Sequence, residues 1–80
     1  MTTSEMNQRV CTAMRAYMDD HGVNQADISR HLGRSESYVS ARMNGKLELS
    51  LDIMSAVAEM THVSPYALMA ELTTRMGPSA

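Results

Sequence analysis

The chain has 80 residues, of which 44% are hydrophobic and 20% are charged, so it fits one small folded domain and not a disordered segment. Its single cysteine, Cys11, excludes an intrachain disulfide and a zinc site built from several thiolates. No apolar run approaches the roughly 20 residues that cross a bilayer, and the N-terminus lacks the pattern of a secretion signal. We therefore expect a cytoplasmic protein with no membrane partner.

The net charge of −2 is unevenly distributed along the sequence. Residues 24–46 carry four basic and two acidic side chains and have a charge of +2, whereas residues 1–23 carry −1 and residues 47–80 carry −3. A basic centre between acidic flanks is a weak sign of phosphate binding, because the local field and not the total charge governs docking. A random scatter of few charges gives the same pattern, so both interpretations stay open.

The first predicted helix begins with a Thr2–Glu5 capping-box pattern and ends at Gly22. Apolar residues recur on one of its faces at the helical period, and they are Met6, Val10, Ala13, Met14 and Tyr17. The second predicted helix follows Asn24, a good N-cap, and stops at Gly33. Its short apolar face consists of Ile28 and Leu32.

Three more helices are predicted in the rest of the chain. Ser35 caps a third helix that Asn44-Gly45 closes, Ser50 opens a fourth, and a fifth starts at Ser64-Pro65 and stops at Gly77-Pro78. No segment alternates apolar and polar residues over a useful length. We expect an all-α fold, with a compact five-helix domain over residues 1–76 and a short disordered tail at 77–80.

Residues 24–45 carry the pattern of a helix-turn-helix. Gly33 suits the tight turn between the two helices, and the small side chain of Ser29 lets them cross closely. The expected buried seam between them consists of Ile28, Leu32 and Val39.

Over residues 5–72 the sequence resembles the Cro and lambda-repressor-like family of helix-turn-helix regulators, also called the XRE family. The matching features are Gln25, the Leu32-Gly33 turn, the run from Ser35 to Val39, Asn44-Gly45 and Val63-Ser64. The run 38–45 is most similar to repressors of actinobacteria and their phages. The resemblance implies a lambda-repressor-like fold and double-stranded DNA as the partner.

The resemblance also implies that the helix at 35–44 enters the major groove with its N-terminal residues against base edges. If Val39 faces inward, Ser37 and Ala41 point outward, and small side chains there let the helix backbone approach the bases. The implied base-reading residues are Glu36, Ser37, Ser40 and Ala41. The implied contacts to the DNA backbone are Gln25, Arg34, Ser35, Tyr38, Arg42, Asn44 and Lys46.

Structural alternatives stay open for several of these residues. Glu36 is also favourable at a helix N-terminus, and Ala41 is also a good helix former. Gln25 fits an ordinary surface position, and Tyr38 fits packing on a neighbouring helix.

Three residues depart from the family pattern. Arg34 and Arg42 stand where apolar residues are usual, and we expect Arg42 to bury its stem and extend its charged head. His62 replaces a frequent glycine, so we expect the turn before the last helix to be strained or built differently.

The nine methionines lie mostly on predicted core faces, and the chain has no Phe or Trp, so we expect them to fill the core. The last helix carries a further apolar stripe of Met69, Leu72 and Met76. We interpret this stripe as a homodimer face, and the alternative is that the helix closes its own core. The three histidines have no ligand spacing with Cys11 or with one another, so we expect neither a metal nor a cofactor.

These observations favour a sequence-specific DNA-binding transcriptional regulator, of the phage-immunity or Cro repressor type, that occupies an operator. An antitoxin or another helix-turn-helix module acting through a protein partner is the alternative. A third reading is a helix-turn-helix that has lost DNA binding. An enzyme is disfavoured, because no set of acid, base and nucleophile is evident and no catalytic residue is assigned.

Overall fold

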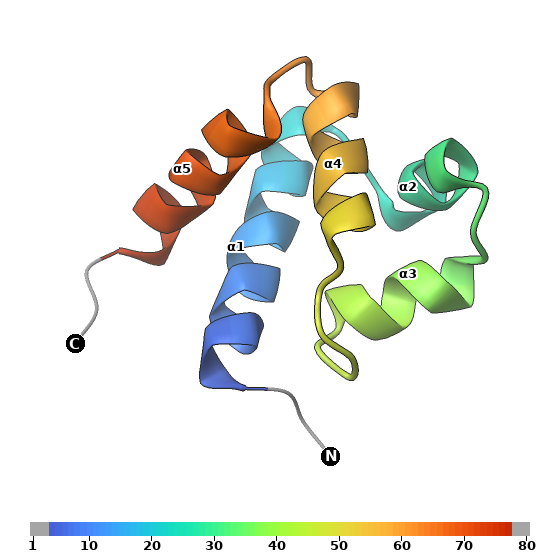
Figure 1. Ribbon diagram of the computed structural model, residues 1–80, viewed down its shortest axis with the longest axis horizontal. Coiled ribbons are helices and arrows are strands. Elements are labelled where there is room, and N and C mark those ends of the chain that lie inside the picture. The colour runs from blue at the N-terminus through green and yellow to red at the C-terminus, as the bar shows by residue number, and fades with distance from the viewer. Residues whose placement is uncertain (1–3, 78–80) are drawn as a thin grey trace.

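A computed structural model describes residues 4–77, which form five α-helices and no β-strand (Figure 1). In chain order the helices are α1 (Glu5–His21), α2 (Gln25–Leu32), α3 (Glu36–Met43), α4 (Leu51–Met60) and α5 (Pro65–Met76). The all-α expectation and the number of helices are thereby confirmed. Over the same residues, none of the helices has both the length and the apolar character needed to span a bilayer.

The N-terminus of α1 differs from the predicted one. Ser4 is the N-cap, and its hydroxyl oxygen accepts a hydrogen bond from the Asn7 backbone N–H at 3.2 Å. Glu5 is consequently the first helical residue and not the third, so the capping box predicted with Thr2 is wrong; Thr2 itself lies outside the described residues. At the other end of the chain α5 stops before Gly77 as predicted, and the rest of the expected tail, residues 78–80, is also outside the described range.

The start of α2 is stabilised by a reciprocal capping box. The Asn24 side chain accepts from the Asp27 N–H at 2.8 Å, and the Asp27 carboxylate accepts from the Asn24 N–H at 3.1 Å. Two of the N–H groups that a helix start leaves without partners are therefore satisfied, which fixes where α2 begins.

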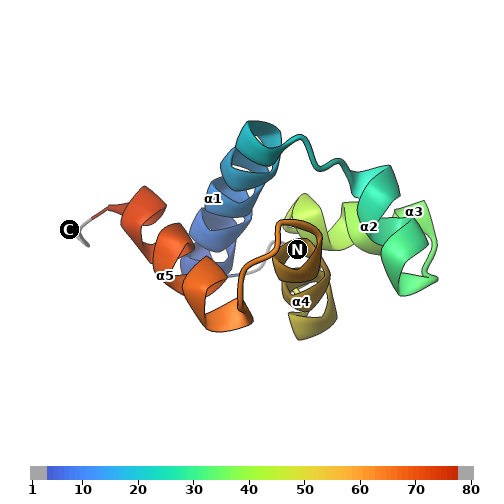
Figure 2. The same ribbon diagram turned by 90° about the horizontal axis from the view of Figure 1, so that it is seen from above.

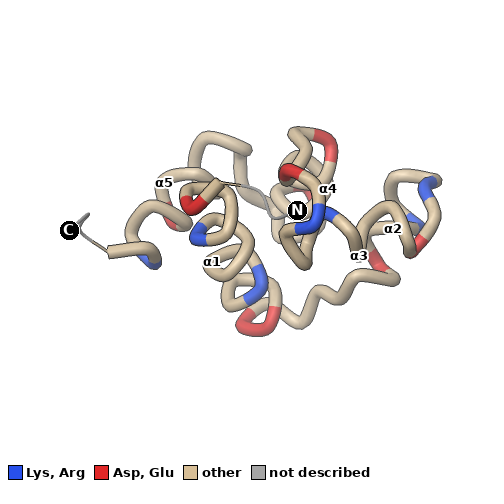
Figure 3. The backbone as a smooth tube through the Cα atoms, turned by 90° about the horizontal axis from the view of Figure 1, so that it is seen from below, with Lys and Arg blue, Asp and Glu red and all other residues tan. Residues whose placement is uncertain are grey.

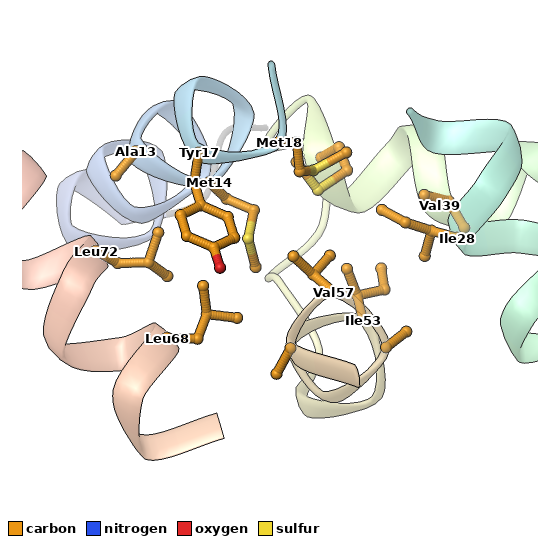
Figure 4. Packing of buried hydrophobic residues seen from close by; sticks show 13 residues of the cluster. Ala13, Met14, Tyr17, Met18, Ile28, Val39, Ile53, Val57, Leu68 and Leu72 are labelled. Atoms are coloured by element: carbon orange, nitrogen blue, oxygen red, sulfur yellow. The ribbon is translucent and has the colours of Figure 1, made fainter. Parts of the chain in front are cut away.

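The α4 helix lies between α5 on one side and α2 on the other, while α1 packs on both α5 and α3 (Figure 2). Buried side chains from all five helices point toward one another in the centre (Figure 4). They include Met14 and Tyr17 from α1, Ile28 from α2, Val39 from α3, Ile53 and Val57 from α4, and Leu68 and Leu72 from α5. This shared core fixes α3 relative to the rest of the chain.

Methionine fills much of this core, as the sequence predicts. Met14, Met18 and Met43 are buried, and their flexible side chains occupy space that aromatic residues would otherwise fill. Met6 is a correction to the predicted apolar face of the first helix, because it lies in the first turn of α1 and is 67% exposed.

The turn between α4 and α5 contains the expected irregularity. His62 has a φ of 60°, in the left-handed region that glycine adopts most readily. The histidine therefore adopts a backbone conformation that favours glycine, with strain at this residue.

Candidate nucleic-acid interface

The two central helices meet as a helix-turn-helix requires. Ile28 of α2 and Val39 of α3 are fully buried against each other's helices and the core, and Leu32 is partly buried beside them. Ser29 is buried at the crossing, where its hydroxyl donates to the Ala26 carbonyl at 2.9 Å. Gly33 has a φ of 67° and reverses the chain between the helices. The predicted seam and turn are confirmed.

The outer side of α3 borders an open, polar groove with a volume of about 440 Å³. The groove is lined by Gln25, Glu36, Ser37, Ser40, Ala41 and Lys46. All four residues expected to read bases therefore lie together with two of those expected to contact the DNA backbone. Glu36, Ser37 and Lys46 are exposed, whereas the others are partly covered by their neighbours.

Two of the expected contact residues also stabilise α3 itself. Ser35 is the N-cap, and its hydroxyl oxygen accepts from the Tyr38 N–H at 3.1 Å. Asn44 at the other end donates from its side chain to the Ser40 hydroxyl oxygen at 3.0 Å. The Ser35 and Ser40 hydroxyls keep their own protons to donate, so these bonds leave both residues able to bind an acceptor.

Tyr38 is placed differently from the first expectation. Its hydroxyl donates to Asp52 at the start of α4, with distances of 3.0 Å to Oδ2 and 3.3 Å to Oδ1, and it lies 3.4 Å from the Ser50 hydroxyl. The alternative left open by the sequence, packing on a neighbouring helix, is the observed one. The hydroxyl proton is used inside the protein, and the contact of Tyr38 with the DNA backbone stays a prediction.

Asp52 is the residue of this site that sequence reasoning missed. The Ser50 hydroxyl donates to its carboxylate, as do the Tyr38 hydroxyl and the Ile53 N–H, and Arg34 lies nearby. Together these groups hold the pKa of Asp52 below its usual range, against the opposing effect of partial burial. No local signal identifies this role, because Tyr38 and Asp52 are 14 residues apart in the chain.

The two unusual arginines meet on the ring of Tyr38. The guanidinium carbon of Arg34 lies 4.5 Å from the ring centroid and that of Arg42 lies 4.2 Å from it, in cation–π contact. Arg42 buries part of its stem, as expected, and its Nε is buried without a hydrogen-bond partner among the described residues. Basic and acidic positions are mixed along α1 and α2 (Figure 3).

The expected apolar stripe of α5 is divided by the structure. Leu72 is 2% exposed and belongs to the core, so its assignment to a dimer face is corrected. Met76 is partly buried against the same core, and Met69 is 50% exposed. The helix therefore closes its own core with Leu68 and Leu72, and it presents Met69 at the edge.

A buried seam between two short helices, a glycine turn and an exposed polar helix face define a helix-turn-helix protein of the kind that binds DNA. The chain belongs to the helix-turn-helix family, whose sequence model matches residues 14–68. Membership makes it a DNA-binding transcription regulator of the XRE type, in agreement with the resemblance seen in the sequence.

Solved structures share the same fold. One crystal structure of the clp gene regulator ClgR from Corynebacterium glutamicum matches with a TM-score of 0.69 and 19% identity, covering 96% of this chain and 100% of that one. A second ClgR structure matches with a TM-score of 0.69 and 20% identity, covering 91% and 78% of the two chains. No curated protein sequence matches significantly. The five-helix fold is therefore shared over nearly the whole chain.

Proposed function

We propose that this chain is a sequence-specific repressor, of the phage-immunity or Cro type, that binds an operator with α3 in the major groove. It acts as a single domain spanning residues 1–76, in the cytoplasm, by occupying DNA that a polymerase needs. The observation that carries the proposal is the polar groove along α3, which gathers Glu36, Ser37, Ser40 and Ala41 between Gln25 and Lys46.

The four residues on the outer side of α3 are proposed to read bases. Glu36 accepts from the amino group of cytosine, and Ser37 and Ser40 exchange hydrogen bonds with base edges. Ala41 contacts a thymine methyl group. The absence of any large side chain at positions 37, 40 and 41 lets α3 lie deep in a groove about 12 Å wide.

The residues around this strip are proposed to hold the DNA backbone. Lys46 and Arg34 are exposed cations at the two ends of α3, and Gln25 and Asn44 supply amide donors beside it. Ser35 donates its hydroxyl proton, and Arg42 presents its guanidinium from the ring of Tyr38. Contacts of this kind set the register of the protein on the duplex without reading sequence.

The chain is further proposed to act as a homodimer, with Met69 and Met76 of α5 at the interface. These methionines line a small apolar groove with Val10 and Met54, on a face formed by α1, α4 and α5. Two copies reading half-sites about 34 Å apart would recognise a palindrome, which one short helix cannot do.

Selection of bound sequences from a random duplex library, at a stated salt concentration, tests the proposed function. A palindromic motif with two half-sites is the expected result, because each copy of α3 reads a few base pairs. Recovery of a random pool, with equal affinity for all duplexes, would contradict sequence-specific repression.

A further inference from the structure

Three side chains on one face of α1 donate hydrogen bonds to the last turn of α3 and to the loop that follows it. The Arg15 guanidinium donates to the Met43 carbonyl at 2.6 Å, and the Cys11 thiol donates to the Arg42 carbonyl at 3.2 Å. The Gln8 amide donates to the Gly45 carbonyl at 3.2 Å. We call Gln8, Cys11 and Arg15 the α1 clamp.

The clamp acts where a helix end needs external partners. The last carbonyls of an α-helix have no N–H partners within the helix, and they carry the negative end of its dipole. Arg15 brings a positive charge and a short hydrogen bond to this end of α3. Burial raises the pKa of the Cys11 thiol, so the thiol stays protonated and keeps donating.

We propose that the α1 clamp sets the tilt of α3 against the DNA and that Arg15 is a positioning residue for base reading. This inference rests on the proposed function, and it assigns a role in specificity to a helix outside the helix-turn-helix. The physical basis is that α3 has only eight residues, that two carbonyls at its C-terminal end accept hydrogen bonds from α1, and that a third carbonyl does so in the loop directly after it. Loss of the charged bond lets that end shift, and the side chains of Ser37 and Ser40 move off their base edges.

A direct phosphate contact is the competing role for Arg15, because its exposed side chain lines a groove together with Gln25. The two roles give different signatures. A phosphate contact contributes equally to all duplexes and to the salt dependence of binding. A positioning residue changes the preference for the operator over random DNA and leaves the salt dependence unchanged.

The test compares Arg15→Met, Arg15→Lys and Arg9→Met with the wild type on the selected operator and on a random duplex. Arg9 is a matched control, since its guanidinium donates at 2.8 Å to the Met76 carbonyl at the end of α5. We expect Arg15→Met to lower the operator preference by about tenfold, the size of coupling seen for residues that do not touch the ligand. Arg15→Lys should keep most of the preference, because it retains a cation at this helix end, and Arg9→Met should keep all of it.

All variants are compared at a temperature where circular dichroism shows them folded. Loss of folding then does not affect the ratio of the affinities for operator and random DNA. An unchanged preference in Arg15→Met overturns the proposal. An equal loss of affinity for the operator and for the random duplex also overturns it, if the slope of log K against log salt becomes shallower by about 0.9. That combination is the signature of a phosphate contact.

Amide hydrogen exchange tests the clamp without DNA. The backbone N–H groups of Asn44, Lys46 and Leu47 donate to carbonyls of α3, so they report opening of its C-terminal end. They should exchange faster in Arg15→Met than in the wild type, and unchanged exchange overturns the clamp whatever the DNA result. If the wild type selects no DNA motif but Arg15→Met still exchanges faster than the wild type, the result contradicts the proposed function and supports the clamp.

Discussion

Tyr38 illustrates how one side chain connects the interface to the core. Its backbone N–H donates to the N-cap side chain of α3, its hydroxyl donates to Asp52 of α4, and its ring is in cation–π contact with two guanidinium groups. The ring therefore holds Arg34 and Arg42 near the exposed side of α3. Arginine heads supported in this way lose less side-chain freedom on binding phosphate than freely moving ones.

Ser37→Ala and Glu36→Gln test base reading residue by residue. Each should change the selected motif at particular base pairs and lower affinity for the wild-type operator by about 1–3 kcal/mol, because a specific donor or acceptor is lost. Ser55→Ala, at an exposed serine of α4, is the control and should select the wild-type motif. The same motif from all four proteins would remove Glu36 and Ser37 from the base-reading set.

Lys46→Ala tests the proposed phosphate contacts. Because one phosphate fewer is neutralised, fewer counterions are released. The negative slope of log K against log salt should therefore become shallower by about 0.9 on both operator and random DNA. Arg30→Ala is the control, because Arg30 is an exposed cation on α2 that pairs with Asp27. A slope that Lys46→Ala leaves unchanged, or that Arg30→Ala makes equally shallow, would count against a phosphate contact by Lys46.

The Asp52 carboxylate makes the free energy of unfolding depend on pH in a defined direction. Its folded-state pKa is lowered, chiefly by the Ser50 hydroxyl and further by Tyr38, so its stabilising effect is complete above the ordinary aspartate pKa of about 3.9. The effect is lost as pH falls through the lowered pKa. Denaturant titrations of the wild type and Asp52→Asn should therefore differ most near neutral pH and converge in acid.

Tyr38→Phe separates the sources of this effect. It keeps the Asp52 carboxylate and removes one donor, so it should show part of the pH-dependent difference of Asp52→Asn. If the wild type and Asp52→Asn keep a constant difference in stability down to about pH 3, the stabilised carboxylate is not the cause.

At the scale of elements, the loop after α3 is more constrained than the other glycine turns. Gly45 has a φ of 78°, and a Cβ placed on it would lie 2.6 Å from Oε1 of Gln8. Gly22 has a similar φ of 69°, but a Cβ there would meet no atom within 4 Å. The two positions therefore share the backbone requirement and differ in the space around them.

Gly45→Ala and Gly22→Ala measure these two effects separately. Gly22→Ala should cost about 1–2 kcal/mol of folding stability from the left-handed backbone, and Gly45→Ala should cost more, because Gln8 must also move. Chemical denaturation of both variants gives the comparison. Equal losses of folding stability would mean that the Gln8 side chain moves at no cost. The Gln8 hydrogen bond would then contribute little to the α1 clamp.

On the scale of the whole molecule, α5 serves the core with one side and leaves Met69 at its edge. If the homodimer forms through this edge, Met69→Glu should give a monomer in multi-angle light scattering, because a charge would be buried between apolar side chains. Leu47→Glu is the matched control, since Leu47 is 49% exposed against 50% for Met69 and lies outside this face. An unchanged mass for Met69→Glu, or a wild type that is already monomeric, would reject the interface.

The sequence by itself determined the five helices, the helix-turn-helix and the family. Asn24, Gly33, Ser35 and Ser64 mark helix ends through bonds and backbone angles that act within one helical turn, so they can be identified without knowing the fold. The irregular turn at His62 could also be predicted from the sequence, because a histidine stands there in place of the glycine that is frequent in the family.

Only the tertiary structure decided which side chains meet. It joined Tyr38 to Asp52, turned Leu72 inward beside Leu68, and placed Arg15 on a carbonyl 28 residues away. Helical periodicity identifies an apolar face, but how much of that face is covered depends on the angles at which the other helices pack. The residues proposed to contact DNA and those proposed to position them can therefore be told apart only once the helices are assembled.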